Sequence, residues 1–575
     1  MLPLLLATLA LALPVAAPIA VAPPITPVGI GVSHDSLPRD PIAYHARLLR
    51  ARALLAARND AAAEAVFDSL TQEYALDHET WIGLATTRRR QQKLRASIDA
   101  YQHALQIGGP VPGNARYWIA TAWAALGDTS RTLETLRQLV HDDHELDRPG
   151  LASDSAFAFL ATDARFRQIV APRMPAAATR SDGWRGDVDH LLSEIGRLSP
   201  DHRGKPLPNE TRALALRLKA SIPTLSDAEI FAQLSRIIAT LHQGHTMMWG
   251  AGPPGTVAPS AMRFTYLPFQ LHAFDEGLHV VATDASVRDL TGARLVRIGS
   301  TSADSAFARV AAVTSVGSAT ETLWTVPIRL SDVLLLRGLG IVRGDSIVAR
   351  FALPSGAIVD RTLTPVSAPV RGKLPAPPTV TAPLFLRHVD QSHWAQPMQD
   401  GRTMYVQFNQ VAGDADETLA DFGLRMRREL AAPALRSVIV DLRHNNGGNT
   451  FTYRELLRTL IAFSAGDGHR VYVLIGRGVY SAAANFSTDL ERLADPIFIG
   501  EPTSMTGNQH GDEGRVLLPY SGLQATIAGV KWQLSHPWDR RASIVPKVPV
   551  SSSARAWLAG EDPVLDTALR MAAAP

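Results

Sequence analysis

Residues 437–448 read SVIVDLRHNNGG, an apolar run that stops at a charged residue and passes into a glycine loop. The run from Ser437 to Val440 is rich in β-branched residues, which predicts a buried strand covered on both faces. Beyond Asp441, the Asn-Asn-Gly-Gly segment can adopt positive φ and bring bare backbone close to a ligand, because Asn tolerates that region and glycine has no Cβ. We therefore expect a loop that can direct backbone N–H groups at one point.

A second strand-and-turn pattern follows about thirty residues later. Residues 471–476 predict another buried strand, residues 477–480 a turn, and Ser481 the start of a helix of small residues. A serine at a strand-to-helix turn lies near unpaired amide donors with a helix dipole behind it, so an oxyanion formed there is stabilised. Taken singly, Asn-Gly-Gly is also typical of a turn, and Ser481 of a helix N-cap. Together the two segments make the chain a candidate serine hydrolase.

The order of three motifs resembles the carboxyl-terminal processing protease and tricorn core protease family. The motifs are DLRxNxGG at 441–448, SAA at 481–483 and IGEPT at 499–503. The resemblance covers roughly residues 180–560. It implies a helical cap at 180–255, a PDZ-like β domain at 262–370 that binds extended peptides by adding a strand, and an α/β crotonase-like catalytic core at 380–575.

The family uses either a serine–lysine dyad or a serine–histidine arrangement completed by an acid. The lysine turn of the first branch corresponds to residues 504–510, which contain no lysine, and Lys531 lies in an alternating segment where we expect its ammonium to point into water. The histidine branch resembles LHQGHT at 241–246, which follows a helix-like run with apolar residues near a 3.6-residue period. We expect His245 to be the base, because an imidazole pKa of about 6.5 suits proton transfer near neutral pH. His242, His510 and a purely structural histidine remain alternatives.

Two positions depart from the family pattern. Gly244 stands where tricorn-type enzymes have a serine beside the base, and we expect it to end the helix. Lys547 follows a proline where the family has aspartate. The resemblance implies an acid a few residues before that proline, and Asp539 is the nearest carboxylate. Asp539 either fixes the tautomer of His245 as the third member of a triad, or pairs at the surface with the arginines that follow it.

The oxyanion donors follow from the glycine loop and the family resemblance together. We expect them to be the amide of Gly447 or Gly448 and the amide of Ala482, immediately after the nucleophile. Asp441 and Arg443 are expected to pair and hold the glycine loop rather than to act in catalysis.

The base and the nucleophile are 236 residues apart, with the PDZ-like domain between them. Because contacts between domains are often modest, we expect a resting structure in which His245 and Ser481 lie beyond hydrogen-bond reach until peptide binds. The predicted function is that of a serine peptidase working through an acyl-enzyme, with no metal or organic cofactor. The alternatives are an inactive protease-like scaffold that binds partner proteins, and an esterase on the same core.

Residues 1–25 predict a secretory signal or an N-terminal anchor, with leucines among alanines over a length too short for a confident membrane span. We therefore expect a periplasmic or secreted protein that meets the membrane only through this segment. The chain has no cysteine, which excludes disulfides and a cysteine nucleophile. Its net charge of +3 is scattered, and nothing indicates nucleic acid as a partner.

Residues 40–170 predict helical repeats. Polar turns at 58–60, 91–93 and 126–128 are 33 and 35 residues apart, each between Ala/Leu-rich helices. The pattern resembles tetratricopeptide repeats, whose period is about 34 residues and whose minimum stable stack is about three units. Such a stack presents a groove for a peptide or partner protein, although a simple helical spacer fits the pattern as well.

Overall fold

A computed structural model of the chain describes residues 38, 40–108, 112–144, 148–170, 177, 179–251, 262, 264–344, 346–378, 380–398 and 401–574. The chain divides into two compact units, Met1–Ala122 and Trp123–Pro575. The predicted signal or anchor at 1–25 lies outside the described residues, and the finer division into five segments stays a prediction. None of the helices in the described ranges combines the length and apolar character that a membrane span needs.

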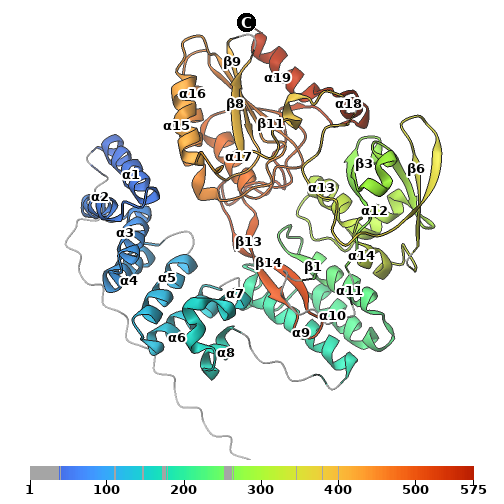
Figure 1. The fold of residues 1–575 in the computed structure, drawn as a ribbon, viewed down its shortest axis with the longest axis horizontal. Helices are drawn as coiled ribbons and strands as arrows, with labels where there is room; N and C mark the ends of the chain where they lie inside the picture. The colour runs from blue at the N-terminus through green and yellow to red at the C-terminus, as the bar shows by residue number, and fades with distance from the viewer. Residues whose placement is uncertain are drawn as a thin grey trace, which may run out of the picture. The chain divides into compact units, whose positions relative to one another are not determined.

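The elements are numbered in chain order (Figure 1). The α-helices are α1 (Pro41–Ala56), α2 (Asp60–Glu73), α3 (His78–Arg90), α4 (Leu94–Gln106), α5 (Pro112–Ala125), α6 (Thr129–Arg137), α7 (Arg148–Ser153), α8 (Ala164–Val170), α9 (Arg180–Leu198), α10 (Asn209–Ser221), α11 (Asp227–Ala239), α12 (Ala303–Ala311), α13 (Ala319–Arg329), α14 (Val333–Gly338), α15 (Leu419–Leu430), α16 (Arg454–Ser464), α17 (Ala482–Leu493), α18 (Ala554–Ala559) and α19 (Pro563–Ala573). The shorter 3₁₀ and π segments are η1 (Gln138–Asp142), η2 (Ser155–Leu160), η3 (Ile222–Thr224), η4 (Ala285–Leu290), η5 (Leu384–Leu386) and η6 (Thr450–Thr452).

The strands form three sheets. They are β1 (Met247–Ala251), β2 (Phe269–Phe274), β3 (Gly277–Thr283), β4 (Arg294–Ile298), β5 (Thr301–Ser302), β6 (Ile347–Ala352), β7 (Ile358–Leu363), β8 (His393–Pro397), β9 (Thr403–Phe408), β10 (Ser437–Asp441), β11 (Arg470–Ile475), β12 (Ile497–Gly500), β13 (His510–Leu517), β14 (Leu523–Lys531) and β15 (Val548–Pro549).

The three polar turns predicted near the N-terminus each join two helices: α1 to α2, α3 to α4, and α5 to α6. Each turn contains one residue with positive φ, namely Arg58 at 59°, Gln92 at 60° and Gly127 at 74°. The same backbone corner therefore recurs at the predicted spacing. The assignment of these helices to tetratricopeptide repeats stays a prediction.

Helix α11 leads to the segment that carries the expected base. Its N-terminus has a capping box between Ser226 and Glu229, and its buried face packs into an apolar core with α9 and α10. The helix ends at Ala239. The expectation that Gly244 ends it is therefore wrong, because the chain has already turned through His242, whose φ is 52°, before it reaches β1.

Strands β2–β7 form an antiparallel sheet of order β2-β3-β4-β6-β7, with β5 paired to β4. Helices α12, α13 and α14 belong to the same part of the chain (Figure 1). Strand β2 lies at the edge of the sheet, and α13 packs against it. The PDZ-like identity of this part stays a prediction.

The sheet that carries the glycine loop has the order β15-β12-β11-β10-β9-β8. Strands β9 to β12 and β15 pair in parallel, and β8 pairs with β9 in the antiparallel sense. Val438 and Val440 pack with α15, α16 and α17, whereas Ile439 packs with α19. The predicted burial of β10 on both faces is confirmed.

A third, three-stranded sheet joins the segment of the expected base to the last third of the chain. Strands β13 and β14 form a hairpin, and β1 pairs with β14, with Met247 opposite Thr526 and Met248 opposite Ala525. The amide of Ala528 also donates to Thr246 Oγ1 at 2.9 Å. Backbone pairing thus fixes the residues immediately after His245 (Figure 1).

Candidate active site

Ser481 occupies the turn between β11 and α17, as the sequence predicts. Its backbone has φ 51° and ψ −126°, a conformation that non-glycine residues rarely adopt. Holding a residue there costs on the order of 1–3 kcal/mol and is a recurrent feature of functional sites. A strained strand-to-helix turn is also how α/β hydrolases expose a nucleophilic serine. The local geometry of Ser481 is therefore compatible with a nucleophile, and its side chain caps no amide of the helix.

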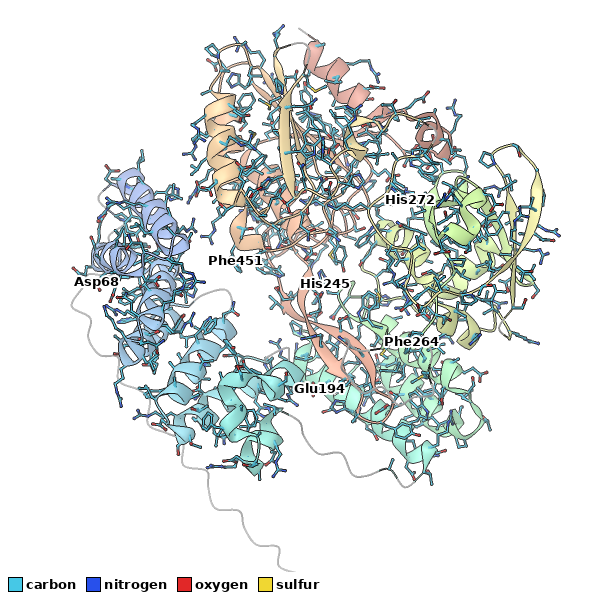
Figure 2. All side chains as sticks on the ribbon, in the orientation of Figure 1. Asp68, Glu194, His245, Phe264, His272 and Phe451 are labelled. Carbon is cyan, nitrogen blue, oxygen red and sulfur yellow. The ribbon has the colours of Figure 1, made fainter. Side chains whose placement is uncertain are left out.

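His245 lies within hydrogen-bond distance of the serine. Its Nε2 atom is 3.1 Å from Ser481 Oγ, which is the reach that proton transfer needs. The residue is buried, with 9% of its surface exposed. Figure 2 labels its side chain. The expectation of a resting structure with the two groups apart is wrong, because the pairing of β1 with β14 already holds the base in place.

The charge state of His245 suits a base. Burial lowers the pKa of the imidazole, while Glu513, Asp512 and the backbone of His510 raise it, and the net direction is downward. The imidazole is therefore neutral near neutral pH, and Nε2 can accept the serine proton. The nearer carboxylate, Glu513, is half exposed and lies 3.9 Å from Nε2.

The expected contact between Asp539 and His245 is not formed. Asp539 instead receives the guanidinium of Arg541, with Oδ2 and Nη2 2.8 Å apart, and the hydroxyl of Ser535 at 2.8 Å. The hydrogen bonds from Arg541 hold the pKa of Asp539 well below its usual range. Among the residues that the structure describes, no carboxylate lies within hydrogen-bond distance of the buried His245 Nδ1. The surface-pair interpretation of Asp539 fits this geometry.

The glycine loop approaches the nucleophile closely. A Cβ atom on Gly447, whose φ is 111°, would lie 2.7 Å from the Cβ of Ser481. The Gly447 amide donates to Asn445 Oδ1 at 3.1 Å, so it is already engaged. Within the described part of the chain, the amides of Gly448 and Ala482 have no acceptor. These two N–H groups are the candidates for an oxyanion site, as expected, and Gly447 supplies the space.

The predicted pairing of Asp441 and Arg443 is present. Arg443 Nη2 lies 2.6 Å from Asp441 Oδ2, and Arg443 Nη1 lies 2.8 Å from Asp562 Oδ1. Asp562 caps the N-terminus of α19, so the arginine joins the glycine loop to the last helix. The sequence signals for Asp562 are a helix cap followed by Pro563, which reveal the helix but not its partner.

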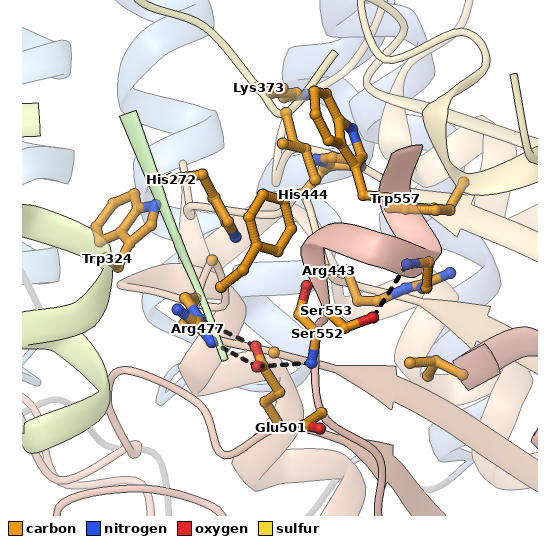
Figure 3. A pocket seen from close by; sticks show the side chains of 18 of the residues that line it. His272, Trp324, Lys373, Arg443, His444, Arg477, Glu501, Ser552, Ser553 and Trp557 are labelled. Atoms are coloured by element: carbon orange, nitrogen blue, oxygen red, sulfur yellow. Dashed lines mark hydrogen bonds and ion pairs between the residues drawn. The ribbon is translucent and has the colours of Figure 1, made fainter. Parts of the chain in front are cut away.

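Two cavities adjoin the site. One, of about 790 Å³, is lined by Gly244, His245 and Tyr480 and by apolar side chains that include Trp249. The other, of about 390 Å³, is lined partly by the glycine loop. Figure 3 shows the second cavity, with the ion pair of Arg477 and Glu501 on one side and His444 near Trp557 on another. Trp324 of α13 lines both cavities.

The other candidate bases are placed elsewhere. His510 Nε2 lies 2.8 Å from Asp201 Oδ2, and Lys531 pairs with the same carboxylate at 3.0 Å. The side chain of Lys531 is more than half exposed, and His242 is exposed. In the described ranges, no group of three or more His, Asp and Glu side chains is arranged to hold a metal ion.

No family model matches the sequence, and no curated protein matches it. Among solved structures, mature CPAF is 12% identical over 68% of this chain and 96% of its own, with a TM-score of 0.48. The photosystem II D1 C-terminal processing protease is 13% identical over 66% of this chain and 98% of its own, with a TM-score of 0.31. The tricorn protease is 15% identical over 67% of this chain and 36% of its own, with a TM-score of 0.30. The processing protease and the tricorn protease are the two kinds of protease named from the sequence motifs.

Proposed function

We propose that this chain is a serine peptidase that cleaves peptide bonds through an acyl-enzyme, with Ser481 as nucleophile and His245 as base. The observation that carries the proposal is the 3.1 Å contact between His245 Nε2 and Ser481 Oγ, on a strained turn that faces two unpaired amides. A nucleophile, a base and oxyanion donors in mutual reach are the requirements of acyl transfer.

In acylation, His245 Nε2 takes the proton of Ser481 as Oγ attacks the carbonyl carbon of the substrate. The resulting oxyanion accepts hydrogen bonds from the amides of Gly448 and Ala482, with the positive end of the α17 dipole behind them. His245 then returns the proton to the leaving amine, the C–N bond breaks, and the acyl group stays on Ser481 as an ester.

In deacylation, His245 takes a proton from water as the water oxygen attacks the ester carbonyl. The same two amides stabilise the second oxyanion. When the tetrahedral intermediate collapses, Ser481 leaves with the proton from His245, and the carboxylic acid product and the free serine are formed.

The substrate class is a peptide or protein chain, and the cavity of about 790 Å³ is the cleft that receives it. Its lining of Met248, Trp249 and Trp324 favours apolar side chains near the cleaved bond. In this proposal the part of the chain at 262–370 binds an extended segment as a PDZ-like domain would, and the helices at 40–170 bind a partner protein.

The protein acts outside the cytoplasm in this proposal, which rests on the apolar N-terminal segment at 1–25. Fractionation of cells expressing the full chain tests it. Recovery of the protein only in the cytoplasmic fraction would contradict export.

The test of the activity is labelling of the full chain with a fluorophosphonate, followed by mapping of the modified residue. We expect label on Ser481, none in Ser481→Ala, and unchanged labelling in Ser487→Ala. Ser487 is a matched control, because it is a buried serine on the same helix whose hydroxyl donates to Ala483 O at 2.8 Å. Absence of label would favour an inactive scaffold, and label with hydrolysis of esters but not of peptides would favour an esterase.

A further inference from the structure

The space beside Gly244 is filled by a buried carboxylate. A Cβ atom on Gly244 would lie 1.8 Å from Glu321 Oε1 and 2.7 Å from the hydroxyl oxygen of Tyr480. Gly244 does not have positive φ, so space rather than backbone conformation demands a glycine here. Since Gly244 immediately precedes the base, Glu321 reaches the segment that holds His245.

Glu321 is held from both ends. It lies in the first turn of α13, where its amide donates to the N-cap hydroxyl of Ser318 at 2.9 Å. Its Oε2 accepts from the amide of Gly317 at 2.6 Å. Ser318 also donates to the carbonyl of Ser504 at 2.8 Å, which ties the start of α13 to the loop after β12. Only 1% of Glu321 is exposed.

Tyr480 connects this carboxylate to the base. Its hydroxyl oxygen and the Glu321 carboxylate flank the same position beside Gly244, and its ring is stacked on the imidazole of His245 with centroids 4.6 Å apart and 24° between planes. Trp324, on the same helix as Glu321, contacts the Tyr480 ring at 5.0 Å. No carboxylate within the described ranges orients His245 Nδ1, and the aromatic stack is one contact that constrains the imidazole plane.

We propose that Glu321 is a positioning residue for the base: its carboxylate holds the Tyr480 hydroxyl, and the Tyr480 ring holds the imidazole of His245 against Ser481. The proposal rests on the proposed function, because it assigns a role within the same site. A glycine at position 244 and a glutamate at position 321 then form one arrangement, in which the carboxylate occupies the volume that a side chain next to the base would need.

The electrostatics give this arrangement a measurable signature. Burial raises the pKa of Glu321 to about 7, against the opposing effect of the Gly317 amide and the Tyr480 hydroxyl. The other charged groups that act on Tyr480 and His245 are Glu513, Asp512 and His510, all on β13. The ionised carboxylate is the stronger acceptor for Tyr480. Activity should therefore rise with pH through about 7, above the limb set by His245, whose pKa burial lowers.

The first experiment compares Glu321→Gln with Glu229→Gln in the full chain, by the pH dependence of kcat and kcat/KM on a small unstructured peptide. Glu229 is the matched control, because it too lies in the first turn of a helix capped by a serine and its carboxylate accepts the cap amide at 2.8 Å. We expect Glu321→Gln to lower kcat by about 10-fold or more, with little change in KM, and to move the acidic limb to lower pH. Glu229→Gln should leave both the rate and the profile unchanged.

A Glu321→Gln variant with wild-type kcat and an unmoved acidic limb would overturn the proposal and leave Glu321 as a helix cap. Labelling of Ser481 by a fluorophosphonate distinguishes failure of the proposed function from failure of the positioning role of Glu321. If the wild-type chain is not labelled, the proposed function fails; if it is labelled and Glu321→Gln behaves as wild type, only the positioning role fails.

The second experiment is a double-mutant cycle between Gly244→Ala and Glu321→Ala. If the methyl group at 244 acts by displacing the carboxylate, the loss of kcat in the double variant should be well below the product of the two single losses. Melting curves for each variant show that the fold is kept. Losses that multiply would refute the shared arrangement.

Discussion

Thr246 joins the base to the rest of the site through one buried hydroxyl. Its Oγ1 accepts from the amide of Ala528 on β14 at 2.9 Å and donates to Gln243 Oε1 at 3.1 Å. Thr246 is fully buried and follows His245 directly. Thr246→Val keeps the shape of the side chain and removes both hydrogen bonds, so it tests whether the β1–β14 attachment sets the position of the imidazole.

The expected magnitude has two parts. The Ala528 amide loses its acceptor, and a buried donor left unpaired costs about 1–3 kcal/mol. The Met247 to Thr526 pairing of the ladder remains, so the fold should survive with a lower free energy of unfolding. A shift of the imidazole by about 1 Å would take the 3.1 Å contact of His245 with Ser481 beyond hydrogen-bond reach and lower kcat by roughly 10²-fold.

The assay pairs denaturant unfolding with steady-state cleavage of a small peptide. Thr211→Val is the matched control, because Thr211 is equally buried and its hydroxyl bonds to Thr240 Oγ1, at the end of α11, at 2.7 Å. Thr211→Val should lose comparable stability and keep its kcat. If Thr246→Val loses stability but keeps full kcat, the hydroxyl does not position the base and the reasoning fails.

Two substitutions distinguish a histidine base from a lysine base. His245→Ala should lower kcat by about 10²-fold or more and Lys531→Ala should change little, and the reverse ranking would indicate a lysine base. Asp539→Asn should change kcat by less than about 2-fold, because surface ion pairs contribute little, whereas a loss as large as that of His245→Ala would restore Asp539 as the orienting acid. Stability should depend on pH through Glu321, whose pKa rises from 4.5 to about 7 on folding. The free energy of unfolding of the wild type should therefore fall as pH rises between those values. In denaturant unfolding at pH 8, Glu321→Gln should be more stable than the wild type by up to about 3 kcal/mol. A difference in stability between the two that does not change with pH would refute the raised pKa.

The strands and turns that carry Ser481 could be predicted because their signals are local. The β-branched runs that became β10 and β11 end where the chain needs positive φ at Gly447 and a helix start at Ala482. The position of His245 relative to Ser481 could not be predicted in the same way. It depends on the register of β1 against β14, residues almost three hundred positions apart, and strand pairing at that separation leaves no local pattern. The expectation of an open resting site failed for that reason.

Asp539 and Glu321 also show that neighbouring residues in the sequence reveal less about a side chain than its packing in the fold does. Asp539 was a candidate from its place in the family pattern, yet Arg541, two residues away, takes its carboxylate. Glu321 gave no functional signal, because Ser318-x-x-Glu321 is a sufficient description of a helix start. Only the packing of α13 beside Gly244 makes that carboxylate part of the site.

Two features of this site oppose the stability of the fold. Both help to place His245 Nε2 beside Ser481 Oγ. Ser481 is held at positive φ, and Glu321 is ionisable yet 1% exposed. Each is locally unfavourable, by an amount comparable to a good hydrogen bond or more. Proteins retain such violations where function requires them. The strained turn presents the hydroxyl of Ser481, and the buried carboxylate, through Tyr480, constrains the imidazole that must meet it. A substitution that removes either unfavourable feature should therefore raise the free energy of unfolding and lower kcat. A residue with a purely structural role would not show this combination of effects.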